Sequence, residues 1–188
     1  AASNDYDPDE IKAIADFVLP LREADLSGRH AALAGLVTSA EIAFVGHSRG
    51  CARTERLIQD FPELEPHTVG VVFLGPADDA IPVPGHFLVM GAGKDGQSFA
   101  WATEGAWDRQ AAPRWKVWMP GANHGNFVDH KVYYAFDGQP SMTRKEQLQQ
   151  VVGWGVPFLQ RAFGLPQPFA SKLDDPPSIA GVEVTADP

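Results

Sequence analysis

The chain has 188 residues, of which 44% are hydrophobic, and its 24 acidic and 15 basic side chains give a net charge of −9. The hydrophobic content is sufficient for one compact domain with its own core, and it excludes global disorder. An acidic chain repels a phosphate backbone, which argues against a nucleic-acid-binding protein. The single cysteine, Cys51, excludes an internal disulfide and a cysteine-based zinc site.

The apolar stretches of the sequence are all much shorter than the roughly twenty residues that span a bilayer, so no transmembrane segment is predicted. The N-terminus also lacks the charged and apolar regions of a signal peptide. We therefore expect a soluble protein. Its compartment is left open by the sequence, and secretion, with the signal segment absent, is the favoured alternative.

The first predicted element is a helix that begins at the capping residues Asp7 and Pro8. Apolar residues then recur at spacings of three and four, which is typical of the buried face of a helix. These residues are Ile11, Ile14, Val18 and Leu21. Pro20 is expected to kink or end this helix. A second, shorter helix is predicted over residues 30–37.

Short runs of apolar residues dominate the middle of the chain and predict strands. The runs cover residues 42–45, 69–74, 87–90 and 115–119. Because nearly every position in them is apolar, we expect strands that are covered on both faces, as in a parallel sheet. Helical patterns at 51–60 and 99–108 lie between them. This alternation predicts an α/β fold, a three-layer α/β/α sandwich around a mostly parallel sheet.

The C-terminal part of the chain carries the clearest helix signal, a T-x-x-E capping box at 143–146 followed by an apolar stripe. Two glycines and Pro157 are expected to bend this helix. The predicted domain covers residues 1–165. The proline-rich residues 166–188 are interpreted as an extended arm or linker, with a lone strand at 179–185.

The strongest chemical motif is G-H-S-R-G at residues 46–50, between a predicted strand and a predicted helix. A nucleophile elbow requires this context, because a tight turn there exposes a serine hydroxyl at the edge of the sheet. Ser48 is then the candidate nucleophile, and the backbone amide of Arg49 is the candidate oxyanion-hole donor. The alternative is a chance pentapeptide in a glycine-rich loop.

A serine nucleophile needs a base, and in this architecture the base is a histidine that follows the last core strand. His124 lies in such a loop, P-G-A-N-H-G-N-F, directly after the run that ends at residue 119. The alternative is a solvated loop histidine. A metal site formed by His124, Asp129 and His130 lacks a recognisable ligand spacing, so neither a metal nor a cofactor is predicted.

The acid that orients the histidine has two candidate loops, each of which follows a predicted strand. Asp95 lies in G-A-G-K-D-G, and Asp78 and Asp79 lie in the preceding loop, G-P-A-D-D. Asp95 is favoured because the strand just before the histidine loop is the usual donor. Either position could also hold an aspartate that simply caps a turn.

Together, GHSRG, GAGKDG and GANHGNF resemble the serine-hydrolase branch of the α/β-hydrolase superfamily. The most similar members are bacterial esterases related to cutinase-like polyester hydrolases, chlorophyllase and platelet-activating-factor acetylhydrolase. The resemblance covers roughly residues 5–163. It implies hydrolysis of small or polymeric carboxylic esters through an acyl-enzyme, with Ser48 as nucleophile, His124 as base and Asp95 as acid. In the chlorophyllase and acetylhydrolase relatives the acid comes one strand earlier, which keeps Asp79 as an alternative.

The sequence departs from this family mainly in its N-terminal part, because only 47 residues precede Ser48. The family has three or four further strands there, together with a loop that donates the second oxyanion amide. The chain therefore resembles the C-terminal half to two-thirds of the fold. We expect a second chain to complete the sheet, either the N-terminal part of the hydrolase or another copy. Two other functions stay open, a non-catalytic fragment that binds or supports a partner and an acyltransferase.

Overall fold

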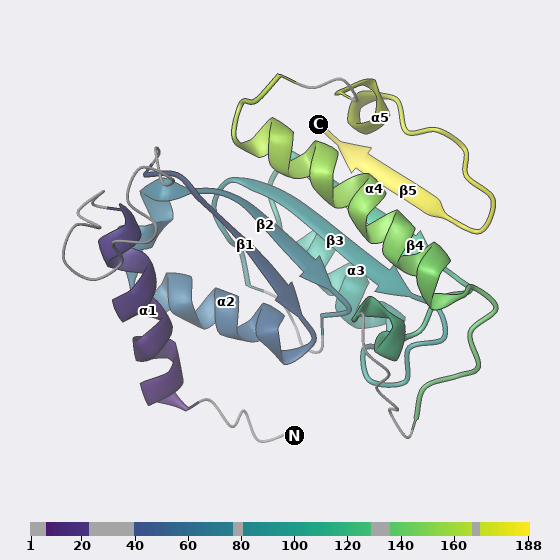
Figure 1. Ribbon diagram of the computed structural model, residues 1–188, viewed down its shortest axis with the longest axis horizontal. Helices are drawn as coiled ribbons and strands as arrows, with labels where there is room; N and C mark the ends of the chain where they lie inside the picture. The colour runs from purple at the N-terminus through teal and green to yellow at the C-terminus, as the bar shows by residue number, and fades with distance from the viewer. Residues whose placement is uncertain (1–6, 23–39, 77–80, 129–135, 167–169) are drawn as a thin grey trace.

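A five-stranded sheet in the order β1-β2-β3-β4-β5 forms the centre of the computed structural model (Figure 1). The structure describes residues 7–22, 40–76, 81–128, 136–166 and 170–188. The strands are β1 (Ile42–His47), β2 (Thr68–Leu74), β3 (His86–Ala92), β4 (Arg114–Met119) and β5 (Glu183–Asp187). The first four run parallel, and β5 runs antiparallel to β4. The predicted α/β fold with a mostly parallel sheet is confirmed.

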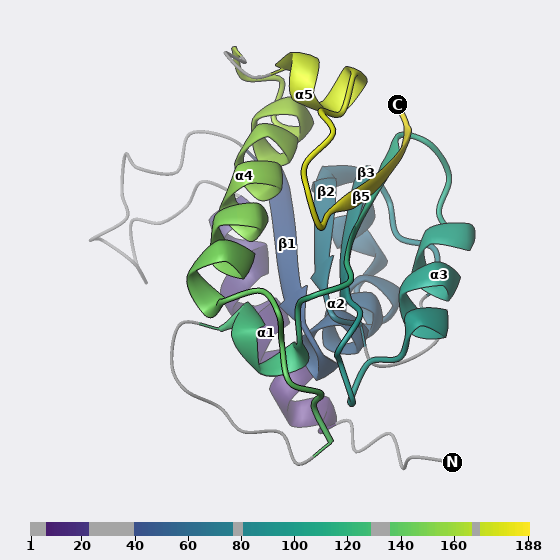
Figure 2. The same cartoon turned by 90° about the vertical axis from the view of Figure 1, so that its right-hand side faces the viewer.

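Helices cover both faces of the sheet (Figures 1 and 2). The longer ones are α1 (Pro8–Arg22), α2 (Arg49–Asp60), α3 (Ala100–Asp108) and α4 (Arg144–Ala162), and the shorter ones are η2 (Pro62–His67), η3 (His124–Phe127) and α5 (Ala170–Asp174). Helices α2 and α3 lie against one face and α4 against the other, while α1 packs on α2. These are the three layers that the alternating pattern predicts.

Alternate residues of the central strands enter two different cores. In β2, Val71 and Phe73 pack in a cluster with residues of α2 and α3, whereas Val72 and Leu74 pack in a cluster with Trp154 of α4. All four side chains are buried. Burial on both faces explains why the run is continuously apolar instead of alternating between apolar and polar residues.

The N-terminal helix is anchored by Ile11 and Ala15, which pack against Leu57 and Leu64. It continues through Pro20 to Arg22 and does not end at the proline. A proline in the last turn removes only its own backbone hydrogen bond, so little helix remains to be disrupted. The helix predicted over residues 30–37 lies outside the described residues.

The C-terminal tail differs most from its prediction, because it folds back onto the domain instead of extending as an arm. Leu173 of α5 is fully buried, and its carbonyl accepts a hydrogen bond of 3.0 Å from the Trp115 indole. Strand β5 pairs with β4 and is not a lone strand. Its half-buried Val184 and Ala186 pack against the core beside α4, and this contact offsets the entropy of ordering a proline-rich segment.

Candidate active site

The turn between β1 and α2 holds Ser48 in a strained backbone conformation. Its φ is 56° and its ψ is −125°, and it is the only non-glycine residue with a positive φ in the part of the chain that the structure describes. Its amide donates to the Leu74 carbonyl at 3.0 Å, and its carbonyl accepts from the Cys51 amide at 3.0 Å. Such strain persists only where surrounding contacts hold it, and it is typical of functional sites.

The two glycines that flank this turn have different roles. A Cβ atom on Gly46 would lie 2.7 Å from the backbone of Cys51, so only glycine lets α2 begin directly beside β1. A Cβ atom on Gly50 would meet nothing within 4 Å. Close approach therefore explains the first glycine of the motif but not the second.

A pair of substitutions tests this difference. Gly46→Ala is expected to lower the free energy of unfolding by about 1–3 kcal/mol, because the clash involves backbone atoms that cannot move aside. Gly50→Ala is the matched control, and it should leave stability unchanged or slightly raised, because alanine is the better helix former. Urea denaturation of both variants measures the effect. Equal stabilities would contradict the close approach.

Asp95 and His124 form a buried pair at the carboxyl ends of β3 and β4. Asp95 Oδ2 and His124 Nδ1 lie 2.6 Å apart, and the two side chains are 1% and 0% exposed. Asp95 Oδ1 accepts hydrogen bonds from the amides of Gln97 at 2.7 Å and Ser98 at 2.5 Å. Both carboxylate oxygens are thus occupied, which fixes the orientation of the carboxylate toward the histidine.

His47, in the serine motif, connects the Ser48 turn to this pair. Its ring centroid lies 4.7 Å from that of His124, with the ring planes tilted by 37°. Gly75, which follows β2 with a φ of 53°, packs from another side, because a Cβ atom there would lie 3.1 Å from His124 Nδ1 and 3.2 Å from Asp95 Oδ2. The carboxyl ends of β1 to β4 therefore converge at the predicted edge of the sheet.

Several sequence-predicted residues lie outside the described residues. These are the alternative acids Asp78 and Asp79, and Asp129 and His130 of the alternative metal site. Within the described ranges, no group of three His, Cys, Asp or Glu residues could hold a metal ion. None of the helices described there is long and apolar enough to cross a membrane.

Arg49 and Cys51 lie in the first turn of α2. Arg49 is the first helical residue, so its backbone amide is one of the unbonded amides at a helix N-terminus, where negative charge is favoured. Cys51 is buried, and burial raises the pKa of its thiol well above its ordinary value. A thiol in that state is a poor nucleophile, and this argues against a cysteine-based reaction.

His47 stays neutral near physiological pH, because burial, followed by repulsion from His124, lowers its pKa from 6.5 to about 4. The unfolded chain therefore binds more protons than the folded chain between these two values. We expect stability to fall as the pH drops from 6.5 to 4, by less than about 1.4 kcal/mol per pH unit. Urea denaturation across this range measures the slope. His47→Gln should reduce it, and an unchanged slope would contradict this assignment.

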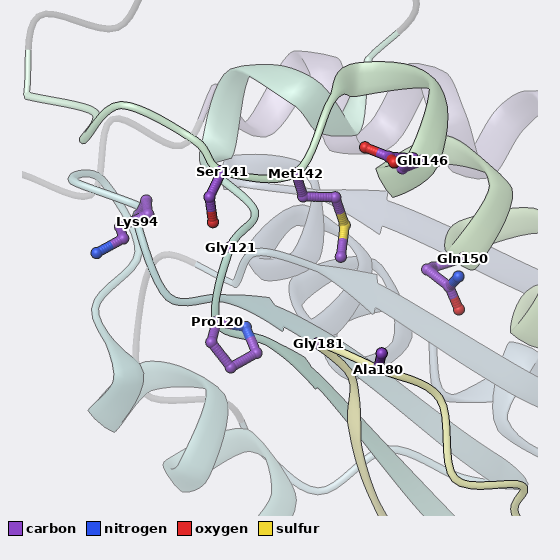
Figure 3. A pocket seen from close by; sticks show the side chains of 9 residues that line it. All are labelled: Lys94, Pro120, Gly121, Ser141, Met142, Glu146, Gln150, Ala180 and Gly181. Atoms are coloured by element: carbon purple, nitrogen blue, oxygen red, sulfur yellow. The ribbon is translucent and has the colours of Figure 1, made fainter.

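An open cavity of about 580 Å³ lies beside the acid and histidine loops (Figure 3). Its lining includes Lys94, the residue before Asp95, and Gly121, which lies in the histidine loop, together with Gly181 of the C-terminal tail. Neither Ser48 nor the buried pair lines it. The cavity therefore neighbours the Asp95–His124 pair without including it.

Asp137 contacts both loops of the pair, although no sequence pattern singled it out. Its two carboxylate oxygens accept hydrogen bonds from the backbone amides of Gly96 and Gly125. The only local signal is an Asp-Gly dipeptide at 137–138, which also occurs in ordinary turns.

No family model matches this sequence, and no curated protein matches it. Among solved structures, the chain is similar to a ferulic acid esterase from Streptomyces cinnamoneus, with a TM-score of 0.61 and 19% sequence identity. The match covers 98% of this chain and 57% of the esterase, so the chain spans just over half the length of that protein. At this identity the likeness shows a shared α/β fold alone.

Proposed function

We propose that the protein is a serine hydrolase that cleaves carboxylic esters. The observation that carries this proposal is the buried contact of 2.6 Å between Asp95 and His124. The His124 ring lies against that of His47, which directly precedes a strained Ser48 at the start of a helix. These are the residue types, in the order Ser, Asp, His, that serine hydrolysis with this architecture requires. The esterase-like fold supports the same reaction class.

In this proposal, the reaction proceeds through an acyl-enzyme. His124 donates its Nδ1 proton to Asp95, so Nε2 is the nitrogen that accepts a proton. Ser48 Oγ attacks the acyl carbon as Nε2 takes its proton, and the imidazolium then returns this proton to the leaving alcohol. Water activated through His124 hydrolyses the acyl-enzyme. Asp95 stabilises the imidazolium, and the Arg49 amide hydrogen-bonds to the oxyanion.

The test is reaction with a fluorophosphonate probe, which labels an activated serine. We expect one label per chain, mapped by mass spectrometry to Ser48. A chain that stays unlabelled would instead support the non-catalytic alternative. A short p-nitrophenyl ester and a ferulate ester are suitable first substrates, and product analysis with added alcohol separates a hydrolase from an acyltransferase.

We also propose that a further polypeptide, the N-terminal part of the hydrolase or a second copy, pairs with β1. Among the described strands, β1 is hydrogen-bonded only to β2, and its Val45 is 59% exposed. An apolar edge strand of this kind favours pairing with another strand. In this proposal the same partner supplies the second oxyanion donor.

A further inference from the structure

We infer that Asp137 is a positioning residue that holds the acid loop and the histidine loop at their working distance, an inference that rests on the proposed function. Asp137 Oδ1 accepts a hydrogen bond from the Gly96 amide at 3.0 Å, and Oδ2 accepts one from the Gly125 amide at 2.9 Å. These two amides belong to the residues that directly follow Asp95 and His124.

Asp137 bridges two peptide units, and each of them directly follows one partner of the buried Asp95–His124 contact. The amide that Asp137 binds in each loop is bonded to the carbonyl carbon of Asp95 or of His124. One planar carboxylate therefore spans the backbones behind both side chains and sets their separation. Because the loops leave different strands, β3 and β4, no local turn can set that distance.

Neighbouring contacts show that the segment around Asp137 packs closely against these two loops. A Cβ atom on Gly96 would lie 1.8 Å from the Phe136 carbonyl oxygen, so only glycine allows this approach. The Gly138 amide donates to the Lys94 carbonyl at 2.8 Å, and the Lys94 amide donates to the Ala122 carbonyl at 2.8 Å. The carboxylate thus lies inside a hydrogen-bonded network that joins three segments of the chain.

A carboxylate is the side chain that this position requires, because both of its partners are N–H donors. Two oxygens can accept from both amides, and a charged acceptor makes the stronger hydrogen bonds. An asparagine offers one oxygen and turns an N–H group toward the second amide. An alanine offers no acceptor at all. We therefore expect kcat to be highest with Asp at position 137, lower with Asn and lowest with Ala.

The effect should appear in turnover more than in substrate binding. A misplacement of about 1 Å between reacting groups can cost a hundredfold in rate. We expect Asp137→Ala to lower kcat on a p-nitrophenyl ester by about 10- to 100-fold, with KM changed less than about twofold. Asp137→Asn should lie between the alanine variant and the parent chain.

A second measurement, by NMR, observes the Asp95–His124 hydrogen bond directly and does not depend on activity. The downfield proton resonance of the His124 Nδ1–H group reports its hydrogen bond to Asp95. We expect this resonance in the parent chain and in Ser48→Ala, and we expect it to be shifted or lost in Asp137→Ala. The matched control is Asp174→Ala, which breaks a 2.5 Å ion pair with Arg161 away from this site and should leave both kcat and the resonance unchanged.

The results separate the two proposals. Full kcat together with an unchanged resonance in Asp137→Ala would overturn the positioning role. If that variant does not fold, as judged by circular dichroism, Asp137→Asn decides in the same way. If fluorophosphonate fails to label the parent chain, the proposed hydrolase function is wrong, and the resonance still decides whether Asp137 positions the pair.

Discussion

Ser48→Ala is expected to reduce the hydrolysis of short p-nitrophenyl esters by about four to six orders of magnitude, because no other group replaces the attacking oxygen. Stability should change by less than about 0.5 kcal/mol. The half-buried side chain loses only its hydroxyl, and alanine experiences the same steric strain as serine at a φ of 56°. The measurements are steady-state kinetics and urea denaturation.

Ser178→Ala is the matched control, because it makes the same chemical change at an exposed position in the C-terminal tail. It should retain the activity and the stability of the parent chain. Titration with the fluorophosphonate probe excludes a contaminating esterase, since about one probe per chain must react. Full activity in Ser48→Ala would contradict the proposed reaction.

The parts of the fold that sequence predicts well are those governed by local periodicity. The four parallel strands lie where continuous apolar runs predict them. The central strands β2 and β3 are buried on both faces, as a continuous apolar run requires, whereas the edge strand β1 exposes Val45. Thr143 is the N-cap of α4, and its side chain and that of Glu146 form the predicted capping box. The contact between Asp95 and His124 follows from chain order, since loops that leave adjacent parallel strands meet at one edge.

The parts that sequence did not predict depend on contacts between distant residues. The proline content of the tail indicates an extended segment, yet β5 pairs with β4 through a register that no local pattern encodes. Asp137 is similar, because its partners Gly96 and Gly125 become neighbours only after β3 and β4 pair. The Asp-Gly dipeptide is common in ordinary turns, so the sequence alone does not distinguish Asp137 from a turn residue.

The second large expected effect concerns assembly of the chain through β1, the exposed edge strand of the sheet. Val45 on the edge strand β1 is 59% exposed. Apolar residues on an edge strand normally pair with another strand or lie under a cover. We therefore expect the purified chain to form an assembly larger than its own 20.3 kDa.

Light scattering measures the size of this assembly, and mass spectrometry of the denatured sample shows whether it contains a second polypeptide or another copy. Val45→Lys should disrupt it, because a lysine on an edge strand opposes pairing with a further strand. Thr185→Lys is the matched control, since it places the same charge at an exposed position on β5, the opposite edge of the sheet. That variant should assemble normally.

Disruption of the assembly should also slow ester hydrolysis, because the partner is proposed to supply the second oxyanion donor. Loss of one such donor typically costs about a hundred- to a thousandfold in kcat. Val45→Lys should therefore lose turnover by this factor while its fold, followed by circular dichroism, stays intact. Thr185→Lys should lose none. A 20.3 kDa monomer that hydrolyses esters at full rate would refute both the partner and its catalytic contribution, and all oxyanion donors would then have to come from this chain.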